Sequence, residues 1–370
     1  MSVHSAKLIF NHCLCFAIPL YATLFLTAAP HHDLWVLIWV LPIWLLVIVD
    51  LISPSESRCQ QDGLPVWLSD CFLLALAVVQ VLNIVLLLNM AMQLQWGTAY
   101  AVLISLANLF AIKIAVGTSS AFSCIVLAHE LIHRKQMYMK FVGRFLLTLV
   151  CYEHFFTEHI RGHHRRFGTP EDPATARFGE SYESFWRRTI PAQFKSAWQL
   201  ESDRLRNSLK GSVGIIRHRV LQGLVFECVL LLAIFYYFGV IAMIVFLMQA
   251  LTAVRKLEAI NYFEHWGLVR LPGNDKAQDA WDSDSWFTLH TMVGLSRHAD
   301  HHLHASKPFY QLQLVDQSPK LPYGYFAMIF FTVFQNKRFR AMATQELQKS
   351  NIGQFARLDA GFKNEICDFQ

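Results

Sequence analysis

The sequence predicts an all-α integral membrane protein with six transmembrane helices in three hairpins and a cytoplasmic helical cap. Two observations support this fold class. The 370 residues are 54% hydrophobic and only 16% charged, whereas soluble globular domains carry about 25% charged residues. The apolar residues also gather in uncharged stretches, several of which approach or exceed the length of about 20 residues that a helix needs to cross a bilayer.

Six apolar stretches are predicted to cross the membrane and to pair into consecutive hairpins: 8–28, 34–53, 66–90, 97–120, 219–238 and 240–260. The short connections within the pairs hold neither lysine nor arginine, and nearly all basic residues lie towards the opposite ends. The positive-inside rule therefore places both termini and the long loops in the cytoplasm. We expect one domain over residues 1–370, with cytoplasmic regions at 121–218 and 261–370.

Two of these helices are expected to continue past the membrane. From Thr98 to Leu127 the chain could form one helix, about 45 Å long at 1.5 Å per residue. The sixth span is expected to continue through Lys256 towards Asn261. Both extensions would carry metal ligands into the cytoplasm. Residues 325–335 are apolar but too short to span, so we expect an interfacial or buried helix there.

The first of four histidine motifs follows the fourth span and reads His129-Glu130-Leu131-Ile132-His133. Two histidines four residues apart lie on one face of a helix, so both rings can reach one metal. Taken alone, this HExxH pattern is also typical of a zinc metalloprotease in which Glu130 is the general base. The remaining motifs bear on this choice.

The second motif contains His159, His163 and His164. His159 and His163 are again four residues apart and are expected to share a helix face. His164 is rotated by about 100° from its neighbour in an α-helix. We therefore expect it to point elsewhere, where it could serve a second metal.

The third motif contains His298 and His301, three residues apart, with His302 beside them, and a fourth site is His265. The four motifs together supply nine candidate ligands. One zinc uses three or four protein ligands, so nine imidazoles fit two metals of coordination number five or six. Imidazole suits iron, copper and zinc, so the ligand type alone does not select the metal.

Other motifs exclude several classes of protein. The eight cysteines form no CxxC pair, which argues against a zinc ribbon, a rubredoxin-type iron site or a disulfide framework on this chain. The sequence also lacks a nucleic-acid-binding motif and the glycine patterns of Rossmann and P-loop proteins. A metal transporter would place ionisable ligands at mid-span, whereas these histidines lie beyond the spans.

Longer segments around the histidines resemble the integral-membrane alkane 1-monooxygenase family, relatives of the membrane fatty-acid desaturases and xylene monooxygenase. The similarity is strongest over Glu158–Glu180, and it extends to Asn261–Leu268 and to Arg297–His302. Trp266 replaces the usual tyrosine of this family, and Asp282 stands where asparagine is usual. These departures bear on the substrate more than on the chemistry.

The resemblance implies two non-haem iron ions held by the nine histidines. It implies O₂-dependent hydroxylation of a terminal methyl group, which converts medium- or long-chain alkanes to 1-alkanols. It also implies a separate rubredoxin with its rubredoxin reductase as electron source, and a location in a bacterial inner membrane with the metal site on the cytoplasmic side.

Metal-bound histidines usually donate their second ring N–H to a carboxylate or carbonyl. The acidic residues best placed to accept these bonds are Glu130, Glu158, Asp172, Glu264 and Asp300. On the second span, Trp44 is a candidate for lining a substrate channel. Interfacial anchoring or packing is the alternative for such a tryptophan.

Two other functions compete with alkane hydroxylation. The first is hydroxylation of another apolar methyl group, on an alkyl-aromatic compound or a lipid chain. The second is proteolysis by a membrane zinc metalloprotease, which would need only His129, Glu130, His133 and one further ligand.

Overall fold

The computed structural model describes residues 3–57, 65–208, 216–270 and 276–356, and this part of the chain is helical. Two isolated bridges, Ser55 with Ser285 and Asp282 with Lys320, are the only extended pairing among these residues. The all-α prediction is therefore confirmed for the described part of the chain.

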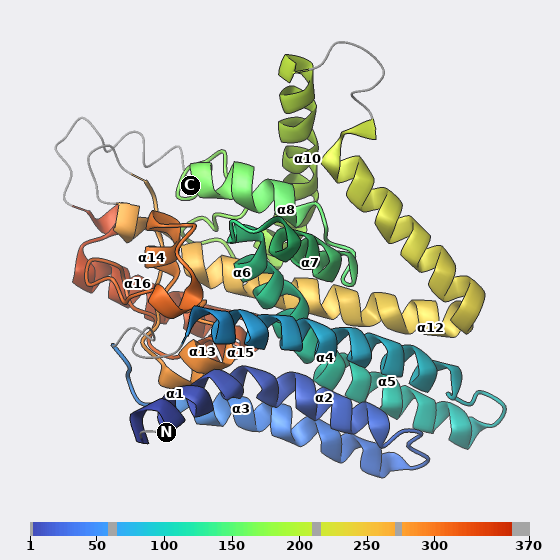
Figure 1. Cartoon of the computed structure of the whole chain (residues 1–370). Helices are drawn as coiled ribbons and strands as arrows, with labels where there is room; N and C mark the ends of the chain where they lie inside the picture. The colour runs from blue at the N-terminus through green and yellow to red at the C-terminus, as the bar shows by residue number, and fades with distance from the viewer. Residues whose placement is uncertain (1–2, 58–64, 209–215, 271–275, 357–370) are drawn as a thin grey trace.

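Long apolar helices lie side by side in the N-terminal half (Figure 1). They are α1 (Val3–Cys13), η1 (Leu14–Phe16), α2 (Ala17–Thr27), η2 (Leu34–Val40), α3 (Leu41–Leu51), α4 (Val66–Met92) and α5 (Ala99–Ser120). In the described ranges, five helical segments are long and apolar enough to cross a membrane: Lys7–Thr27, Leu34–Leu51, Val66–Met92, Ala99–His133 and Arg219–His265. The chain is a membrane protein.

The last of these segments, α12 (Arg219–His265), covers the fifth and sixth predicted spans. Gly239 interrupts it with φ 83° and ψ 175°, a backbone conformation that glycine adopts because it has no Cβ. The helix changes direction there, and its two arms form a V (Figure 1). The described chain thus has five long helical segments in place of the six predicted spans, because the last two predicted spans join at Gly239 into one segment.

The predicted helical continuations are confirmed. α5 runs through the π-helix η3 (Ala121–Val126) into α6 (Leu127–His133), which makes one segment of 35 residues. α12 continues as far as His265. The histidines of the first motif and His265 lie on these two extensions.

The remaining helices, most of them shorter, lie outside this bundle, many of them at the end opposite the turn at Gly239 (Figure 1). They are α7 (Met137–Thr148), α8 (Phe155–Thr157), η4 (Glu158–His163), α9 (His164–Arg166), α10 (Tyr182–Ser208), η5 (Lys276–Asp279), α13 (Trp286–Thr291), α14 (His298–Leu303), η6 (Phe309–Gln311), α15 (Tyr325–Phe334), α16 (Asn336–Ser350) and η7 (Gly353–Phe355). α15 is the short apolar helix predicted at 325–335, and ten residues are too few to span a bilayer.

The buried carboxylate of Asp50, near the end of α3, ties the bundle to this cap. It accepts hydrogen bonds from the hydroxyls of Ser285 (2.7 Å) and Thr288 (2.9 Å) and from the backbone amide of Ala327 (3.1 Å). A side chain at Gly324 would collide with the same carboxylate. Because a buried polar group needs such partners, α3 fixes α13 and α15, which flank the segment that carries the third histidine motif.

Candidate metal centre

Histidine side chains from four segments meet at this end of the bundle, and their ring nitrogens form two groups. Within each group the nitrogens lie within 4.8 Å of one another. The first group consists of His129, His133, His159, His164 and His301. The second group consists of His163, His265, His298 and His302. The structure thus brings together all nine histidines that the sequence nominated.

The second motif divides between the two groups in a way that the expected α-helix does not explain. Residues Glu158–His163 form a π-helix, whose backbone hydrogen bonds join residues five apart, so its wider turn shifts the side chains around the axis relative to an α-helix. His159 and His164 therefore face the first group together, and His163 faces the second. The expectation that His159 and His163 share a face was wrong, because it assumed α-helical geometry.

The third motif lies on α14, which is α-helical. His298 and His302 are four residues apart and share the second group, while His301 faces the first. The sequence spacing of the three histidines had left this division open. His265, at the end of α12, completes the second group.

Close contacts between Nε2 atoms show that each group surrounds a common point. His164 Nε2 lies 3.0 Å from His159 Nε2 and 3.1 Å from His301 Nε2. A ring nitrogen carries either a proton or a lone pair, so it cannot donate one of these hydrogen bonds while it accepts the other. Lone pairs directed at a shared cation explain both contacts, because nitrogens bound side by side at about 2.1 Å from a metal lie about 3 Å apart.

The second group repeats this arrangement. His298 Nε2 lies 3.1 Å from His265 Nε2 and 2.9 Å from His302 Nε2. Among the nine histidines, the Nε2 atoms of His129, His133 and His163 are buried without a hydrogen-bond partner in the described chain. Since buried polar atoms normally have partners, these orphaned nitrogens also fit the binding of metal.

The protonation state of the rings suits metal binding. Burial, reinforced by the neighbouring imidazoles, lowers the pKa of His159, His164 and His301 well below the ordinary value for histidine. These rings are therefore neutral at pH 7. A neutral imidazole offers the lone pair that a metal requires.

Two of the five predicted acidic partners contact the histidines, both in the second group. Asp172 Oδ2 lies 2.9 Å from His163 Nδ1, and Thr175 donates a hydrogen bond of 2.7 Å to the same oxygen. Burial alone would raise the pKa of Asp172, but the contact with His163 holds it below its ordinary value. Glu264 Oε1 lies 3.4 Å from His298 Nδ1 and accepts a hydrogen bond of 2.8 Å from Tyr325.

The other three acidic candidates bond to different groups. Glu130 pairs with Arg134 at 2.8 Å and accepts the Phe309 amide at 3.2 Å. Glu158 pairs with Arg166 at 2.8 Å. Asp300 pairs with Lys307 at 2.6 Å.

Sequence reasoning missed one partner of the second group. His265 Nδ1 lies 3.2 Å from the backbone carbonyl oxygen of Asp279. The side chain of Asp279 pairs with Arg270 at 2.9 Å. A backbone carbonyl leaves no mark in the residue pattern, so no sequence signal could have identified it.

Trp44 lies on α3 and is 38% exposed. Its ring contacts Phe330 and Phe334 of α15, at centroid distances of 6.1 and 5.7 Å. A role for Trp44 in a substrate channel stays a prediction.

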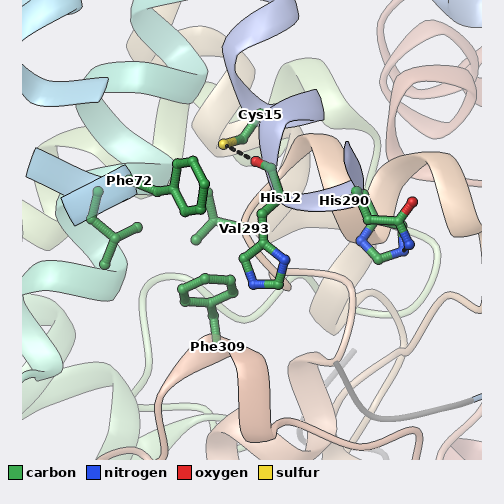
Figure 2. Close-up of a pocket in the computed structure, with 8 residues that line it drawn as sticks. His12, Cys15, Phe72, His290, Val293 and Phe309 are labelled. Atoms are coloured by element: carbon green, nitrogen blue, oxygen red, sulfur yellow. Dashed lines mark hydrogen bonds between the residues drawn. The ribbon is translucent and has the colours of Figure 1, made fainter. Parts of the chain in front are cut away.

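A small pocket lies between α1 and the segment around Phe309 (Figure 2). Figure 2 shows the His12 ring between Phe72 and Phe309, with His290 to one side. The pocket offers about 10 Å³ for the centre of a water-sized molecule, roughly what one water needs. The pocket has no room for an alkyl chain.

Comparison with known proteins places this architecture among membrane enzymes. Residues 104–332 match the model of the fatty acid desaturase family, and the chain belongs to that family. It is 38% identical over 222 residues to alkane 1-monooxygenase 1 of Pseudomonas aeruginosa, covering 58% of each chain. It is also 38% identical over 220 residues to alkane 1-monooxygenase 1 of Alcanivorax borkumensis, covering 58% of this chain and 54% of that protein.

A more distant similarity reaches a second kind of hydroxylase. The chain is 25% identical over 209 residues to the xylene/toluene monooxygenase hydroxylase component XylM of Pseudomonas putida, covering 55% of each chain. The chain thus spans little more than half the length of the curated relatives that it matches. The matched family region contains all nine histidines.

Proposed function

We propose that this protein is a non-haem di-iron monooxygenase that hydroxylates the terminal methyl group of medium- or long-chain alkanes to give 1-alkanols. The observation that carries the proposal is the pair of histidine groups, with five and four ring nitrogens around two separate points. One zinc ion would use three or four ligands, so the number of histidines favours two metals.

In this proposal one iron is held by His129, His133, His159, His164 and His301. The other is held by His163, His265, His298 and His302. Two irons would supply the activation of O₂ that breaks an unactivated C–H bond, which amino-acid side chains cannot do. The protein holds the imidazoles neutral, the hydrogen bond of Asp172 fixes the orientation of His163, and Glu264 lies 3.4 Å from the outer nitrogen of His298.

The similarity to alkane 1-monooxygenases supports an alkane as substrate. A hydrocarbon partitions into the bilayer, and the long apolar helices place the histidines at the end of a membrane bundle. The similarity to XylM supports a second candidate, hydroxylation of a methyl group on an aromatic ring. The chemistry at the metals is the same for both substrates.

We propose a separate rubredoxin, reduced by rubredoxin reductase, as the electron donor. The lack of a CxxC pair in this chain supports an electron carrier on another chain. The proposed topology has six spans, with α12 crossing twice around Gly239. Both termini and the metal centre then face the cytoplasm of a bacterial inner membrane, as the distribution of lysine and arginine favours.

The surroundings of Glu130 argue against a zinc protease. A general base must be free to take a proton from water, whereas Glu130 is paired with Arg134 and accepts the Phe309 amide. His129 and His133 also share their group with three further histidines.

An activity assay tests the substrate class. Purified protein in lipid should convert dodecane to 1-dodecanol only when both O₂ and reduced rubredoxin are supplied. If every alkane is inert and xylene yields its benzyl alcohol, the alkane assignment is wrong and the chemistry stands. Peptide cleavage without O₂ would instead support the protease.

A further inference from the structure

One face of α7 exposes large apolar side chains outside the predicted spans. Met137 is 76% exposed, Tyr138 54%, Phe141 71% and Phe145 42%. At 100° per residue these four side chains fall within about a 100° arc of the helix. An exposed apolar face of this kind marks a contact with lipid or with another protein.

The opposite face of α7 is fixed to the helix that carries the first histidine motif. Met139, Leu146 and Leu147 are buried, and Gly143 packs directly against α6. A Cβ at Gly143 would lie 2.8 Å from Ile132 Cγ2 and 3.1 Å from the Ala128 carbonyl oxygen. The exposed face is therefore the outer surface of the layer that holds His129 and His133.

Two observations support a position of this face at the membrane surface: an ion pair that links the turn before α7 to a region near an exposed tryptophan, and lysines beside the apolar side chains. Arg134, between α6 and α7, pairs with Asp70 in the first turns of α4 at 3.2 Å. The exposed Trp67 of α4 lies one turn from Asp70, and tryptophan is enriched where the bilayer meets water. Lys135 is exposed and Lys140 is half-buried beside the apolar arc, so positive charge accompanies the apolar side chains.

We propose that α7 is an interfacial membrane helix whose Met137–Tyr138–Phe141–Phe145 face inserts at the headgroup boundary, with Lys135 and Lys140 on acidic lipid phosphates. Apolar side chains next to lysines are the composition of helices that bind acidic bilayers. Because α7 packs closely on α6 at Gly143, lipid contact at α7 also stabilises the helix that carries His129 and His133. The lipid contact does not depend on the proposed reaction.

Radical footprinting of the full chain in lipid nanodiscs tests this placement. Trypsin releases Gln136–Lys140, so oxidation of Met137 and Tyr138 is read by mass spectrometry against the free peptide of the same sequence. In nanodiscs with acidic lipid we expect at least about tenfold less oxidation than in the peptide, the ratio expected when large apolar side chains prefer lipid to water.

Charge reversal provides the matched control. Lys135→Glu combined with Lys140→Glu should restore oxidation of Met137 in acidic nanodiscs, whereas Lys349→Glu, at an exposed position of α16, should leave it unchanged. Because the double variant lacks both lysine cleavage sites, trypsin releases residues 135–144 from it, and the free peptide of that sequence is its reference. Oxidation equal to that of the free peptide would overturn the proposal. So would protection that appears only when an acidic electron-donor protein is added. Protection that is identical in neutral nanodiscs and indifferent to the lysines would overturn the assignment to acidic lipid.

Discussion

The two histidine groups differ in what surrounds them. In the four-histidine group, Asp172 and the Asp279 carbonyl are hydrogen-bonded to the outer nitrogens of His163 and His265, and Glu264 lies 3.4 Å from that of His298. In the five-histidine group, no ring has a carboxylate of the described chain within 4 Å. The two proposed metals are thus held in different ways.

This difference suggests that the two sites hold a metal by different means. One site relies on the number of its histidine ligands, and the other relies on the groups that contact its histidines from outside. Five neutral imidazoles provide one more ligand than four, and they do so without acidic partners. The smaller group compensates with carboxylates, which orient the rings and raise their basicity. The proposed metal of the four-histidine group should therefore be the more sensitive to changes outside its ligands.

The largest effect is expected when a central ligand of either group is removed. His164 and His298 each have two Nε2 neighbours at about 3 Å. His164→Ala or His298→Ala should each remove about half of the iron and reduce turnover by more than the 10–100-fold typical of outer-shell changes. Metal analysis and product formation measure both.

His304→Ala is the matched control, because His304 lies on the same segment, is largely exposed and pairs with Asp300. It should keep the iron content and turnover of the parent. If His164→Ala kept full iron, the shared-cation explanation of its two contacts would be wrong.

A smaller effect is expected from the outer partner of His163. Asp172→Asn removes the charge but keeps the size of the side chain, and it should lower metal affinity or activity by about 10–100-fold. The loss should fall on the four-histidine group alone. Iron retention during dialysis against a chelator measures it, with the exposed neighbour Glu171→Gln as the control. Equal loss from both groups would contradict the proposed difference between them.

The sequence was sufficient for much of this arrangement. Length and apolarity located the long helices, and spacing identified nine histidines that the structure gathers. The division of the nine histidines into two groups could not be predicted, because it depends on the π-helical geometry of Glu158–His163. The joining of two spans at Gly239 depends on backbone angles in the same way. The role of the Asp279 carbonyl depends on tertiary position.

A still smaller effect is expected from the support of Glu264. Tyr325→Phe removes the hydrogen bond of 2.8 Å to Glu264, together with a longer one of 3.4 Å to the Leu295 carbonyl oxygen, and leaves the Glu264 carboxyl group in place. A typical buried hydrogen bond contributes about 0.5–1.5 kcal/mol, which changes an equilibrium by about tenfold at most. Iron retention in the four-histidine group should fall by less than for Asp172→Asn, and Tyr323→Phe should not change it. A loss larger than that of Asp172→Asn would give Tyr325 a more direct role.

The smallest effect on iron is expected at Asp300, which lies between two ligands in the sequence but bonds to Lys307 and His304. Asp300→Asn should lower the melting temperature while it changes iron content less than Asp172→Asn does. Calorimetry and metal analysis of the same preparation separate the two effects. Iron loss without a change in melting temperature would show that proximity in sequence, and not contact, decides which acids support the metals.

Metal content of the purified chain tests the central claim most directly. Elemental analysis of protein expressed with iron should find about two irons per chain. It should find about one in both His164→Ala and His298→Ala, and close to none when the two changes are combined. One zinc per chain without iron, retained in His298→Ala, would contradict the two-metal account.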